Sequence, residues 1–366
     1  MKILHLGKYY PPYAGGIEAY CKTICEGLVS KGHEVDIVVA NNLNQFVMER
    51  INGVNIFRLP RKAVLGSIPI CPTMPFFVRK LVKENNHDAI HLHYPNPMAE
   101  MSYFFGCRNM KLIITYHTDA STKYRAKLLY LLASKLLLRC AKHIIVTSKS
   151  YLESRDALIG YINKCQIIPI PVSSPFLLPI DVNGVAEIKR KYGVFILFVG
   201  NLSSYKGSHY LIEAMVNIKC NLVMVGIGAD NSITEFIKKL GLENRIYFPG
   251  KVEEKELINF YDSCELFCLP SVSPMETFGI VLLEAMARGK PVISTELGTG
   301  TSWVNQNGET GLVVKPKSSK VLSAAINHVL QNDDIRLRMS NNAQKRVIEG
   351  FTIDKIISSI IDAYIN

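Results

Sequence analysis

The segment "ETFGIVLLEAMARGKPVIS" runs from Glu276 to Ser294 and places two carboxylates, Glu276 and Glu284, around an apolar stretch that contains Gly279. It follows the strand-like run "ELFCLPS". We expect Gly279 to start a helix, whose first backbone N–H groups lack intrahelical partners and can bind phosphate oxygens. A carboxylate only accepts hydrogen bonds and therefore suits vicinal hydroxyls. The alternative is structural: one glutamate caps the helix and the other is exposed.

Short apolar runs alternate with helical stretches along the whole chain of 366 residues, a length typical of two domains. Runs in the first half are "MKILHLG", "EVDIVVA", "DAIHLHY", "KLIITYH", "HIIVTS" and "CQIIPIP". After "PVSSPFLLPIDVNG" the pattern restarts with "FILFVG", "NLVMVG", "RIYFPG", "ELFCLP", "PVIST" and "TGLVVK". Strands that are apolar on both faces and separated by helices indicate parallel sheets.

The pattern predicts an α/β protein with two doubly wound, Rossmann-like domains. We place the first at residues 1–172 and the second at 173–351, and expect a helix at about 352–366 to pack back on the first. Ligands of such sheets bind beyond the carboxyl ends of the strands, so the cleft between the domains is the expected site.

Positive charge is concentrated in the first half. Residues 1–172 hold 22 Lys and Arg against 11 Asp and Glu, whereas residues 173–366 hold 20 of each. This asymmetry indicates an anionic partner for the first half, either a phospholipid surface, a nucleic acid or a phosphorylated substrate. An ordinary basic surface is the alternative.

Composition and local patterns exclude several classes of protein. The hydrophobic content of 48% with 20% charged residues is typical of a folded protein. No window holds 18 uncharged apolar residues, and the first residues do not resemble a signal peptide. Nine cysteines without zinc-site spacing indicate reduced thiols. We therefore expect a cytoplasmic protein, dissolved or resting on a membrane face.

Two further loops could bind phosphate. "YYPPYAGGIEAY" brings Gly15 and Gly16 to the start of a helix, where the backbone can approach a ligand closely. The loop is not G-x-G-x-x-G, which disfavours a dinucleotide oxidoreductase. "VGNLSSYKG" places Lys206 after the first strand of the second half, where a lysine can pair with phosphate, although it could also be a solvated residue at a helix start.

Together these segments resemble the retaining glycosyltransferases of family 4, which have the GT-B fold. The features that carry the resemblance are the E-x7-E spacing, "AMARGKPVI", "CLPS", the Gly-Gly loop and "VGNLSSYKG". "ELGTGTSWVNQNGETGLVV" further resembles a branch rich in bacterial mannosyltransferases and other enzymes of O-antigen and exopolysaccharide assembly.

The resemblance implies roles for the second half. Glu276 would hold hydroxyls of the donor sugar, Glu284 the nucleotide ribose, and Lys206 the diphosphate. The backbone amides of Phe278, Gly279 and Ile280 would bind the sugar and the diphosphate, and the backbone of Val252 would contact the base. The chain departs from the family at Asn201, where an Arg usually stands as the first cation of the diphosphate site.

In the first half, the resemblance places Gly15 and Gly16 near the diphosphate and His117, in "TYHTD", against the donor sugar. We therefore expect Glu276, His117 and Lys206 to be catalytic. His117 could instead simply end its strand.

The resemblance implies transfer with retention of configuration and without a metal or other cofactor. The leaving phosphate oxygen would accept the acceptor's proton, and Lys206 and the helix amides would stabilise the departing diphosphate. No D-x-D stands at a strand end. His91 and His93, in "HLHYP", could suggest a metal, but without a third ligand in view we interpret them as cleft or strand-end histidines.

The expected partners are a nucleotide-diphosphate sugar and a glycan or polyprenyl-diphosphate-linked acceptor. Segments 122–143 and 68–83 mix leucines and aromatics with Lys and Arg, which suits an anionic membrane on its inner face, although a core helix with solvated lysines is the alternative for the leucines. The rival functions are a non-transferring GT-B enzyme such as a nucleotide-sugar epimerase, and a nucleic-acid-binding protein. No nucleic-acid module is recognisable, so we expect no nucleic-acid partner.

Overall fold

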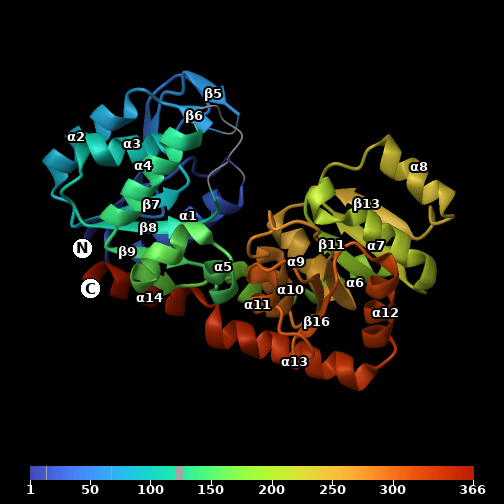
Figure 1. Cartoon of the computed structure of the whole chain (residues 1–366). Coiled ribbons are helices and arrows are strands. Elements are labelled where there is room, and N and C mark those ends of the chain that lie inside the picture. The colour runs from blue at the N-terminus through green and yellow to red at the C-terminus, as the bar shows by residue number, and fades with distance from the viewer. Residues whose placement is uncertain (14, 67, 120–126) are drawn as a thin grey trace. The chain divides into compact units, whose positions relative to one another are not determined.

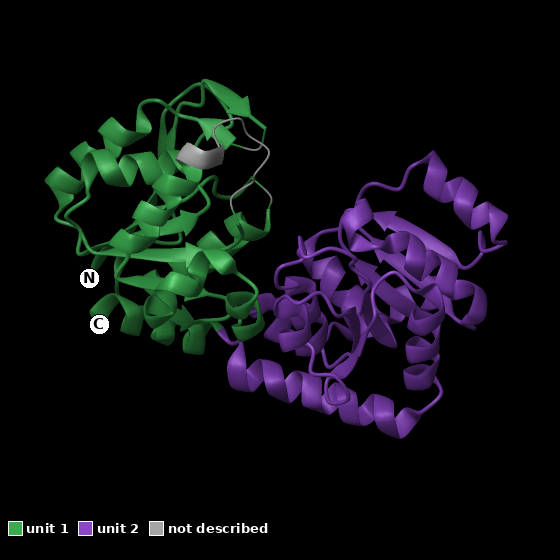
Figure 2. Cartoon of the chain, viewed as in Figure 1, with its two compact units in different colours: residues 1–171, 353–366 green, residues 172–352 purple. Residues whose placement is uncertain are grey.

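The computed structural model describes residues 1–13, 15–66, 68–119 and 127–366, with backbone only for 127–129. The chain divides into two compact units (Figure 2): residues 1–171 with 353–366, and residues 172–352. The boundary that the sequence suggested, between residues 172 and 173, lies one residue from this division. Each unit is an α/β structure with its own sheet.

The first unit contains an eight-stranded sheet with helices between its strands (Figure 1). Its strands are β1 (Lys2–Leu6), β2 (Glu34–Ala40), β3 (Val47–Ile51), β4 (Val54–Leu59), β7 (Ala89–Tyr94), β8 (Leu112–Tyr116), β9 (His143–Val146) and β10 (Cys165–Ile167), with the separate pair β5 (Ala63–Leu65) and β6 (Ile68–Ile70). Its helices are α1 (Gly16–Ser30), α2 (Met74–Asn85), α3 (Pro97–Gly106), α4 (Lys127–Cys140), α5 (Lys149–Glu153), the 3-10 helix η1 (Asp156–Lys164) and α14 (Ile353–Ile365). Residues 122–126 of the basic, leucine-rich segment lie outside the described residues.

The strand order of this sheet is β10-β9-β8-β7-β1-β2-β4-β3. All neighbours are parallel except β3 and β4. The sequence pattern predicted parallel strands only and missed this hairpin. Asn52 and Gly53 form its turn with φ of 49° and 84°, the left-handed conformation of an Asn-Gly hairpin turn. The order reverses beside β1, which pairs with β2 on one side and β7 on the other.

Helix α14 belongs to the first unit although it is the last element of the chain. It packs on α1, where a Cβ atom at Gly27 would lie 2.6 Å from two atoms of Ile357. Only glycine permits this separation without a shift of the isoleucine. The Lys111 ammonium also donates a hydrogen bond of 2.6 Å to the backbone oxygen of Tyr364, so α14 is held at its C-terminal end as well.

The second unit contains a six-stranded sheet. Its strands are β11 (Phe195–Val199), β12 (Asn221–Val225), β13 (Ile246–Gly250), β14 (Leu266–Leu269), β15 (Val292–Thr295) and β16 (Gly311–Val314). Its helices are α6 (Val182–Tyr192), α7 (Ser208–Ala214), α8 (Asn231–Lys239), α9 (Glu254–Ser263), α10 (Ile280–Ala287), α11 (Gly300–Val304), α12 (Ser319–Leu330) and α13 (Asp333–Gly350), with the 3-10 helices η2 (Ser174–Leu177), η3 (Ser204–Lys206) and η4 (Met215–Asn217).

The order of the second sheet is β13-β12-β11-β14-β15-β16, and all its strand pairs are parallel. Every residue of β11 and β14 is buried, as expected for central strands covered by helices on both faces. The order reverses between β11 and β14. The loops that leave the carboxyl ends of these two strands therefore run in opposite directions. The space between two such loops is where doubly wound sheets bind ligands.

A buried ion pair holds the end of α10. The Arg288 guanidinium donates two hydrogen bonds of 2.7 Å to the Asp262 carboxylate in α9, and also bonds the backbone oxygens of Phe176 and Leu178. Both charged side chains are at most 5% exposed. A bidentate pair fixes orientation as well as distance, so it sets where α10 lies over the sheet.

Among the described residues, no helix has both the length and the apolar character needed to cross a membrane. All nine cysteines are free thiols, and six of them are buried.

Candidate functional site

The centre of the site in the second unit is an ion pair between Lys206 and Glu276. Lys206 ends η3 in the loop after β11, and Glu276 stands in the loop after β14. The Lys206 ammonium lies 2.5 Å from Glu276 Oε2, and the side chains are only 12% and 10% exposed. The Ser271 hydroxyl donates a hydrogen bond of 3.2 Å to the same oxygen. This ion pair therefore connects the loop after β11 with the loop after β14.

The backbone conformation of Gly279 and the hydrogen bonds around it position the start of α10. Gly279 precedes the helix with φ of 75°, a conformation that favours glycine, and a Cβ atom there would lie 2.9 Å from Leu282. The Thr299 hydroxyl donates to the Glu276 backbone oxygen (2.7 Å), and the Gly300 N–H donates to the Thr277 oxygen (2.8 Å). These bonds hold the loop so that the first-turn amides of the helix face outward from its end.

The Phe278 side chain is buried and packs near the rings of Trp303 and Phe351. It therefore anchors the loop, and only its backbone can serve a ligand. Ile280 is the first residue of α10. The three residues whose amides the sequence predicted to bind phosphate are thus contiguous at one helix start.

Glu284 lies one turn into α10 and accepts a hydrogen bond of 2.8 Å from the Tyr261 hydroxyl. Burial raises the pKa of Glu284 to about 7, while the Tyr261 bond and the Lys206 charge act in the opposite direction. The carboxyl therefore titrates near neutral pH. A carboxyl of this kind near the start of a helix is a candidate for ligand binding.

Asn201 and Val252 lie at the carboxyl ends of other strands of the same sheet. Asn201 is exposed two residues after β11, and Val252 is half-buried two residues after β13. The Lys206 side chain lies beside the end of β11, because a Cβ atom placed on Gly200 would be 3.6 Å from Lys206 Cε. Lys206 is therefore near the strand end that carries Asn201.

The first unit holds Gly15 and Gly16 at the start of α1, both exposed. A Cβ atom at Gly15 would lie 2.1 Å from Glu18 Oε2, so the buried Glu18 carboxylate folds back over this glycine. Burial raises the pKa of Glu18, and the charge of Lys8 opposes the shift. The carboxylate of Glu18, in the first turn of α1, therefore lies beside the start of that helix.

His117 follows β8 and is 8% exposed. Its Nε2 lies 3.1 Å from Nδ1 of His93, and burial lowers the pKa of His117 to about 3. Both His91 and His93 are buried in β7, and His93 is the last residue but one of that strand, so our interpretation of them as cleft or strand-end histidines stays a prediction. A third histidine, His5 of β1, lies beside them: one ring nitrogen from each of the three lies within 4.8 Å of the others, which the spacing along the chain could not show.

Three hydroxyl residues of the second-unit site were missed by sequence reasoning: Ser271, Thr299 and Tyr261. Ser271 stood in the quoted "CLPS" run and could have been found as the polar residue nearest the end of β14. Thr299 and Tyr261 come from segments 23 residues away from Glu276 and Glu284. Only the fold brings them together.

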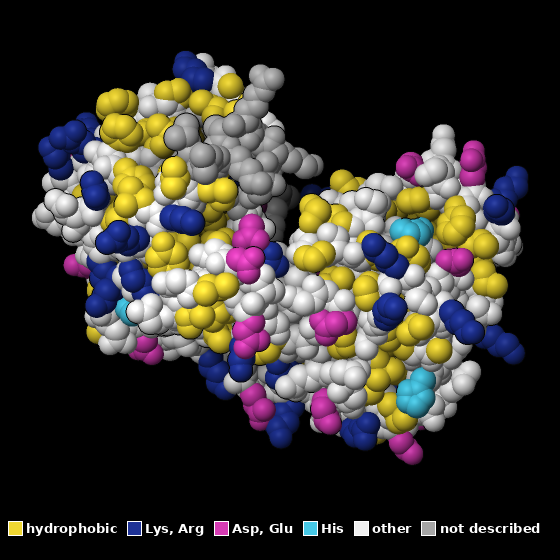
Figure 3. Space-filling view, in the orientation of Figure 1, with side chains coloured by type: hydrophobic (Ala, Val, Ile, Leu, Met, Phe, Trp, Pro, Cys, Tyr) yellow, Lys and Arg dark blue, Asp and Glu magenta, His cyan; other side chains and the backbone are white. Residues whose placement is uncertain are grey.

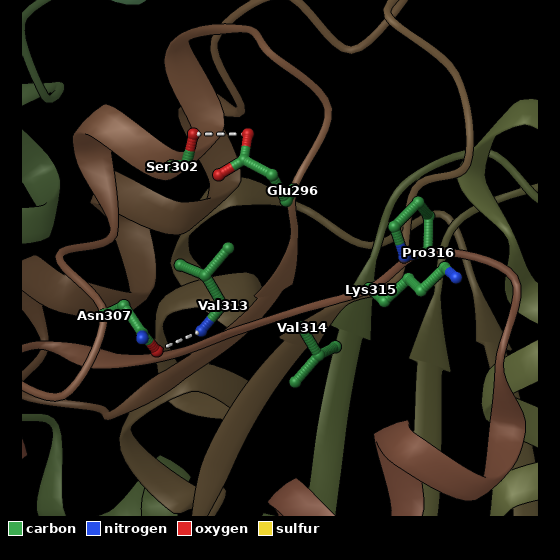
Figure 4. A pocket seen from close by; sticks show the side chains of 7 residues that line it. All are labelled: Glu296, Ser302, Asn307, Val313, Val314, Lys315 and Pro316. Atoms are coloured by element: carbon green, nitrogen blue, oxygen red, sulfur yellow. Dashed lines mark hydrogen bonds between the residues drawn. The ribbon is translucent and has the colours of Figure 1, made fainter.

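A separate shallow pocket lies at the carboxyl ends of β15 and β16 (Figure 4). It is lined by Glu296, Ser302, Asn307, Val313, Val314, Lys315 and Pro316. Ser302 donates a hydrogen bond to Glu296 (3.0 Å) in this pocket, and the Asn307 side chain accepts one from the Val313 N–H (2.9 Å). None of the residues predicted from the sequence lines it.

Comparison with known proteins identifies the family. Residues 14–174 match the profile "Glycosyltransferase Family 4", and residues 185–346 match "Glycosyl transferases group 1". An uncharacterised glycosyltransferase of Methanocaldococcus jannaschii is 30% identical over 100% of this chain and 98% of its own length. The chain belongs to glycosyltransferase family 4. The O-antigen chain mannosyltransferase C of Escherichia coli is 29% identical, covering 100% of this chain and 97% of the relative.

Solved structures agree with the fold of this family 4 glycosyltransferase. Anabaena HepE, in a crystal structure with UDP, superposes with a TM-score of 0.79 at 21% identity, covering 99% of each chain. The GT-B fold expected from the sequence, with two Rossmann-like units, is therefore confirmed.

The raised pKa of Glu284 predicts a specific dependence of stability on pH. Because the folded state keeps the carboxyl protonated where the unfolded state has lost the proton, the stability it contributes is fully present below about pH 4.5 and is lost as the pH rises through about 7. Replacing Glu284 by Gln removes this titration. We expect wild type to lose stability relative to Glu284→Gln between pH 4.5 and 7, measured by urea unfolding. Parallel pH profiles of the two proteins would contradict the raised pKa of Glu284.

Proposed function

We propose that this enzyme transfers a hexose from a nucleoside-diphosphate sugar to a glycan or lipid-linked oligosaccharide, with retention of configuration. The observation that carries the proposal is the Lys206–Glu276 pair at the strand reversal of the second sheet. A cation beside a helix start suits a diphosphate, and a carboxylate beside it suits the hydroxyls of a sugar.

Glu276 has one oxygen to offer a sugar. Lys206 and Ser271 both contact Oε2, so within the described residues Oε1 has no hydrogen-bond donor. Glu284 is arranged in the same way, because Tyr261 donates to its Oε2. In our proposal Oε1 of Glu276 accepts from the donor sugar, and Glu284 accepts from the ribose.

Lys206 and the first-turn amides of α10 supply positive potential where the diphosphate leaves. As the bond between the anomeric carbon and the phosphate oxygen breaks, negative charge grows on that oxygen, and preorganised donors there lower the barrier. The same oxygen takes the proton of the acceptor hydroxyl as that hydroxyl forms the new glycosidic bond on the same face. Asn201 and the Val252 backbone are assigned to the diphosphate and the base, and Gly15, Gly16 and His117 to the donor from the first unit. We propose that transfer requires no metal.

The names of two relatives support the choice of donor and acceptor to test. One is named an O-antigen chain mannosyltransferase and one solved neighbour was crystallised with UDP, so GDP-mannose and UDP-hexoses are the donors to test. The acceptor would be a glycan or a polyprenyl-diphosphate-linked oligosaccharide of a surface polysaccharide such as O-antigen, capsule or lipopolysaccharide. A nucleotide-sugar epimerase is the alternative outcome, and it would form no new glycoside.

Removal of the Lys206 charge is the decisive substitution. We expect Lys206→Ala to lower kcat/KM for the donor by about 10²- to 10³-fold, as the loss of one charge-stabilising donor does in other enzymes. Asn201→Ala should cost about tenfold or less, because a neutral hydrogen bond contributes about 0.5–1.5 kcal/mol. Asn201→Arg, which restores the usual family cation, should be tolerated. The measurement is release of nucleoside diphosphate coupled to formation of glycoside, with the anomeric configuration read by NMR.

The matched control is Lys239→Ala, which removes an exposed lysine of α8. It should change neither kcat/KM nor the melting temperature. A folded Lys206→Ala protein with near wild-type kcat/KM would sink the phosphate-site assignment. Activity that EDTA abolishes and manganese restores would overturn the metal-independent mechanism.

We also propose that the first unit binds the inner face of an anionic membrane. Helix α4 exposes Leu132 and Leu136 together with Lys135 and Arg139. These residues recur at helical spacing and form one outward face. Apolar and basic groups on a single face suit the interface of a membrane rich in anionic lipid.

Neighbouring helices extend this surface. Helix α2 exposes Phe76, Lys80 and Lys83, and it packs on α3, which exposes Phe105. The Tyr130 hydroxyl of α4 bonds Glu100 of α3 (2.8 Å), so the three helices are adjacent. Figure 3 shows yellow apolar and dark-blue basic side chains interspersed over the part of the first unit where Figure 1 labels α2, α3 and α4.

Neutralising the basic residues of α4 should weaken membrane binding. We expect Lys135→Gln with Arg139→Gln to lower affinity for vesicles containing phosphatidylglycerol by about 30-fold, since each cation near such a surface contributes about 1 kcal/mol. Binding should also fall as salt rises. Lys238→Gln with Lys239→Gln in α8 is the control and should bind as wild type. Equal sedimentation with neutral phosphatidylcholine vesicles, or with neither kind, would count against the proposal.

A further inference from the structure

Helix α11 of the second unit lies between α13 and the turn formed by residues 277–280, which we call the donor turn. At five residues α11 is a short helix, and it packs against α10 (Figure 1). A helix of this length is not stable without tertiary contacts. The groups that bond its two ends therefore decide where it lies.

The N-terminal end of α11 is bonded to the donor turn and to the residue before it. The Thr299 hydroxyl donates a hydrogen bond of 2.7 Å to the Glu276 backbone oxygen, and the Gly300 N–H donates one of 2.8 Å to the Thr277 oxygen. A Cβ atom at Gly300 would lie 2.8 Å from Cδ2 of Phe278, so the helix start and the turn are in direct contact. A shift of α11 therefore displaces the turn.

The donor turn leaves three backbone donors available to a ligand. Among the described residues, none accepts a hydrogen bond from the N–H groups of Phe278, Gly279 and Ile280. In a helix that began earlier, the Ile280 N–H would bond the Glu276 oxygen, which here accepts from the Thr299 hydroxyl. Backbone donors without a partner inside a protein are uncommon, which indicates that a bound ligand accepts from them.

The C-terminal end of α11 is bonded to Arg346 of α13. The half-buried guanidinium donates through Nη2 to the Trp303 backbone oxygen (2.6 Å) and through Nε to the Val304 oxygen (3.0 Å). The last carbonyl groups of a helix have no partners within it, so the guanidinium supplies the donors that α11 lacks. Its positive charge also lies at the end of the helix where the partial charge is negative.

The same guanidinium lies against the aromatic rings that support the donor turn. Its central carbon is 5.5 Å from the ring centres of both Trp303 and Phe351. These two rings meet edge to face at 5.4 Å, and the Phe278 ring lies 6.3 Å from Trp303 and 6.4 Å from Phe351. A cation is attracted to such ring faces. Arg346 thereby acts on the turn through the backbone of α11 and through these rings.

A second anchor of α11 is Asn305, the residue that follows the helix. Its buried side-chain amide donates hydrogen bonds to the Val292 and Leu312 backbone oxygens and to Ser294 Oγ. These bonds fix the residue after α11 to β15 and β16. We therefore expect loss of the Arg346 guanidinium to loosen α11 without detaching it from the sheet.

We propose that Arg346 is a positioning residue of the donor site. It holds α11 and the rings of Trp303, Phe278 and Phe351 together, so that the three free N–H groups of the donor turn keep the geometry that a diphosphate requires. Donors fixed in advance where negative charge develops contribute most to catalysis. The identity of the ligand as a diphosphate rests on the proposed function, whereas the dependence of the turn on Arg346 does not.

The first test is exchange of the Gly300 N–H, whose bond to Thr277 joins α11 to the donor turn. It is read in the ligand-free protein by hydrogen-exchange mass spectrometry of peptides that contain Gly300. Arg346→Met keeps an unbranched side chain but donates no hydrogen bond, so this N–H should exchange about three- to tenfold faster, the range of one hydrogen bond. Arg338→Met in the same helix is the matched control and should exchange as wild type, because Arg338 is exposed and donates to the Gly308 oxygen (3.4 Å).

The second test is nucleotide affinity, measured by calorimetry. Arg346→Met should lower the preference for GDP over GMP, or for UDP over UMP, by about three- to tenfold, since the turn is assigned to the phosphates and other residues to the base and ribose. A general loss of structure would instead lower the affinity for mono- and diphosphate alike.

A third variant keeps both tests available if Arg346→Met does not fold. Arg346→Lys retains the charge but lacks the planar fork that bonds two carbonyl groups. Its Gly300 exchange and its diphosphate preference should lie between those of wild type and those expected for Arg346→Met. Melting temperatures check folding throughout.

Three results would overturn the inference: wild-type exchange at Gly300 in the folded Arg346 variants, an unchanged preference for the diphosphate in those variants, or the same changes in Arg338→Met. If exchange at Gly300 changes as expected but no nucleotide binds the wild-type protein, the proposed function fails and the dependence of the donor turn on Arg346 stands.

Discussion

The pairing of Lys206 with Glu276 is the interaction on which the arrangement of the site depends. It joins the loops after β11 and β14, which the strand reversal would otherwise part. Removing one partner of a mostly buried ion pair leaves the other charge unpaired and shielded from water, which is destabilising. The stability of the site therefore depends on both residues. The surrounding contacts extend this constraint: Ser271 orients the carboxylate, Thr299 holds its backbone, and the Arg288–Asp262 pair fixes the far end of α10.

Much of this site could be predicted from the sequence because its components are local. Glu276, Gly279 and Glu284 lie within nine residues, and a glycine between a buried strand and an apolar helix has few possible backbone roles. Lys206 was recognisable for the same reason, as a cation just past a strand. Partners from distant segments were not predictable, since Tyr261 reaches Glu284 only because α9 and α10 lie beside each other. The β3–β4 hairpin was missed for a different reason. Its Asn-Gly pair is a recognisable signal for a hairpin turn, and the prediction overlooked it.

The histidines show the limit of periodicity most clearly. The alternation "HLH" correctly placed His91 and His93 on one face of a strand. It could not show that β1 would bring His5 into register beside them, or that the hydroxyl of a tyrosine 273 residues from His91 would bond to its ring. The first unit thus combines buried histidines inside its sheet with a basic and apolar surface on α2 and α4. The second unit holds the Lys206–Glu276 pair at its strand reversal, and that division fits a protein whose units serve different partners.

The most direct test of the account is a crystal structure of the protein with GDP or UDP. The account predicts the two phosphates against the Lys206 ammonium and the first-turn amides of α10, with the ribose hydroxyls on Glu284 Oε1. A nucleotide bound instead in the pocket between β15 and β16, lined by Glu296 and Lys315, or bound without contact to Lys206 and α10, would contradict it.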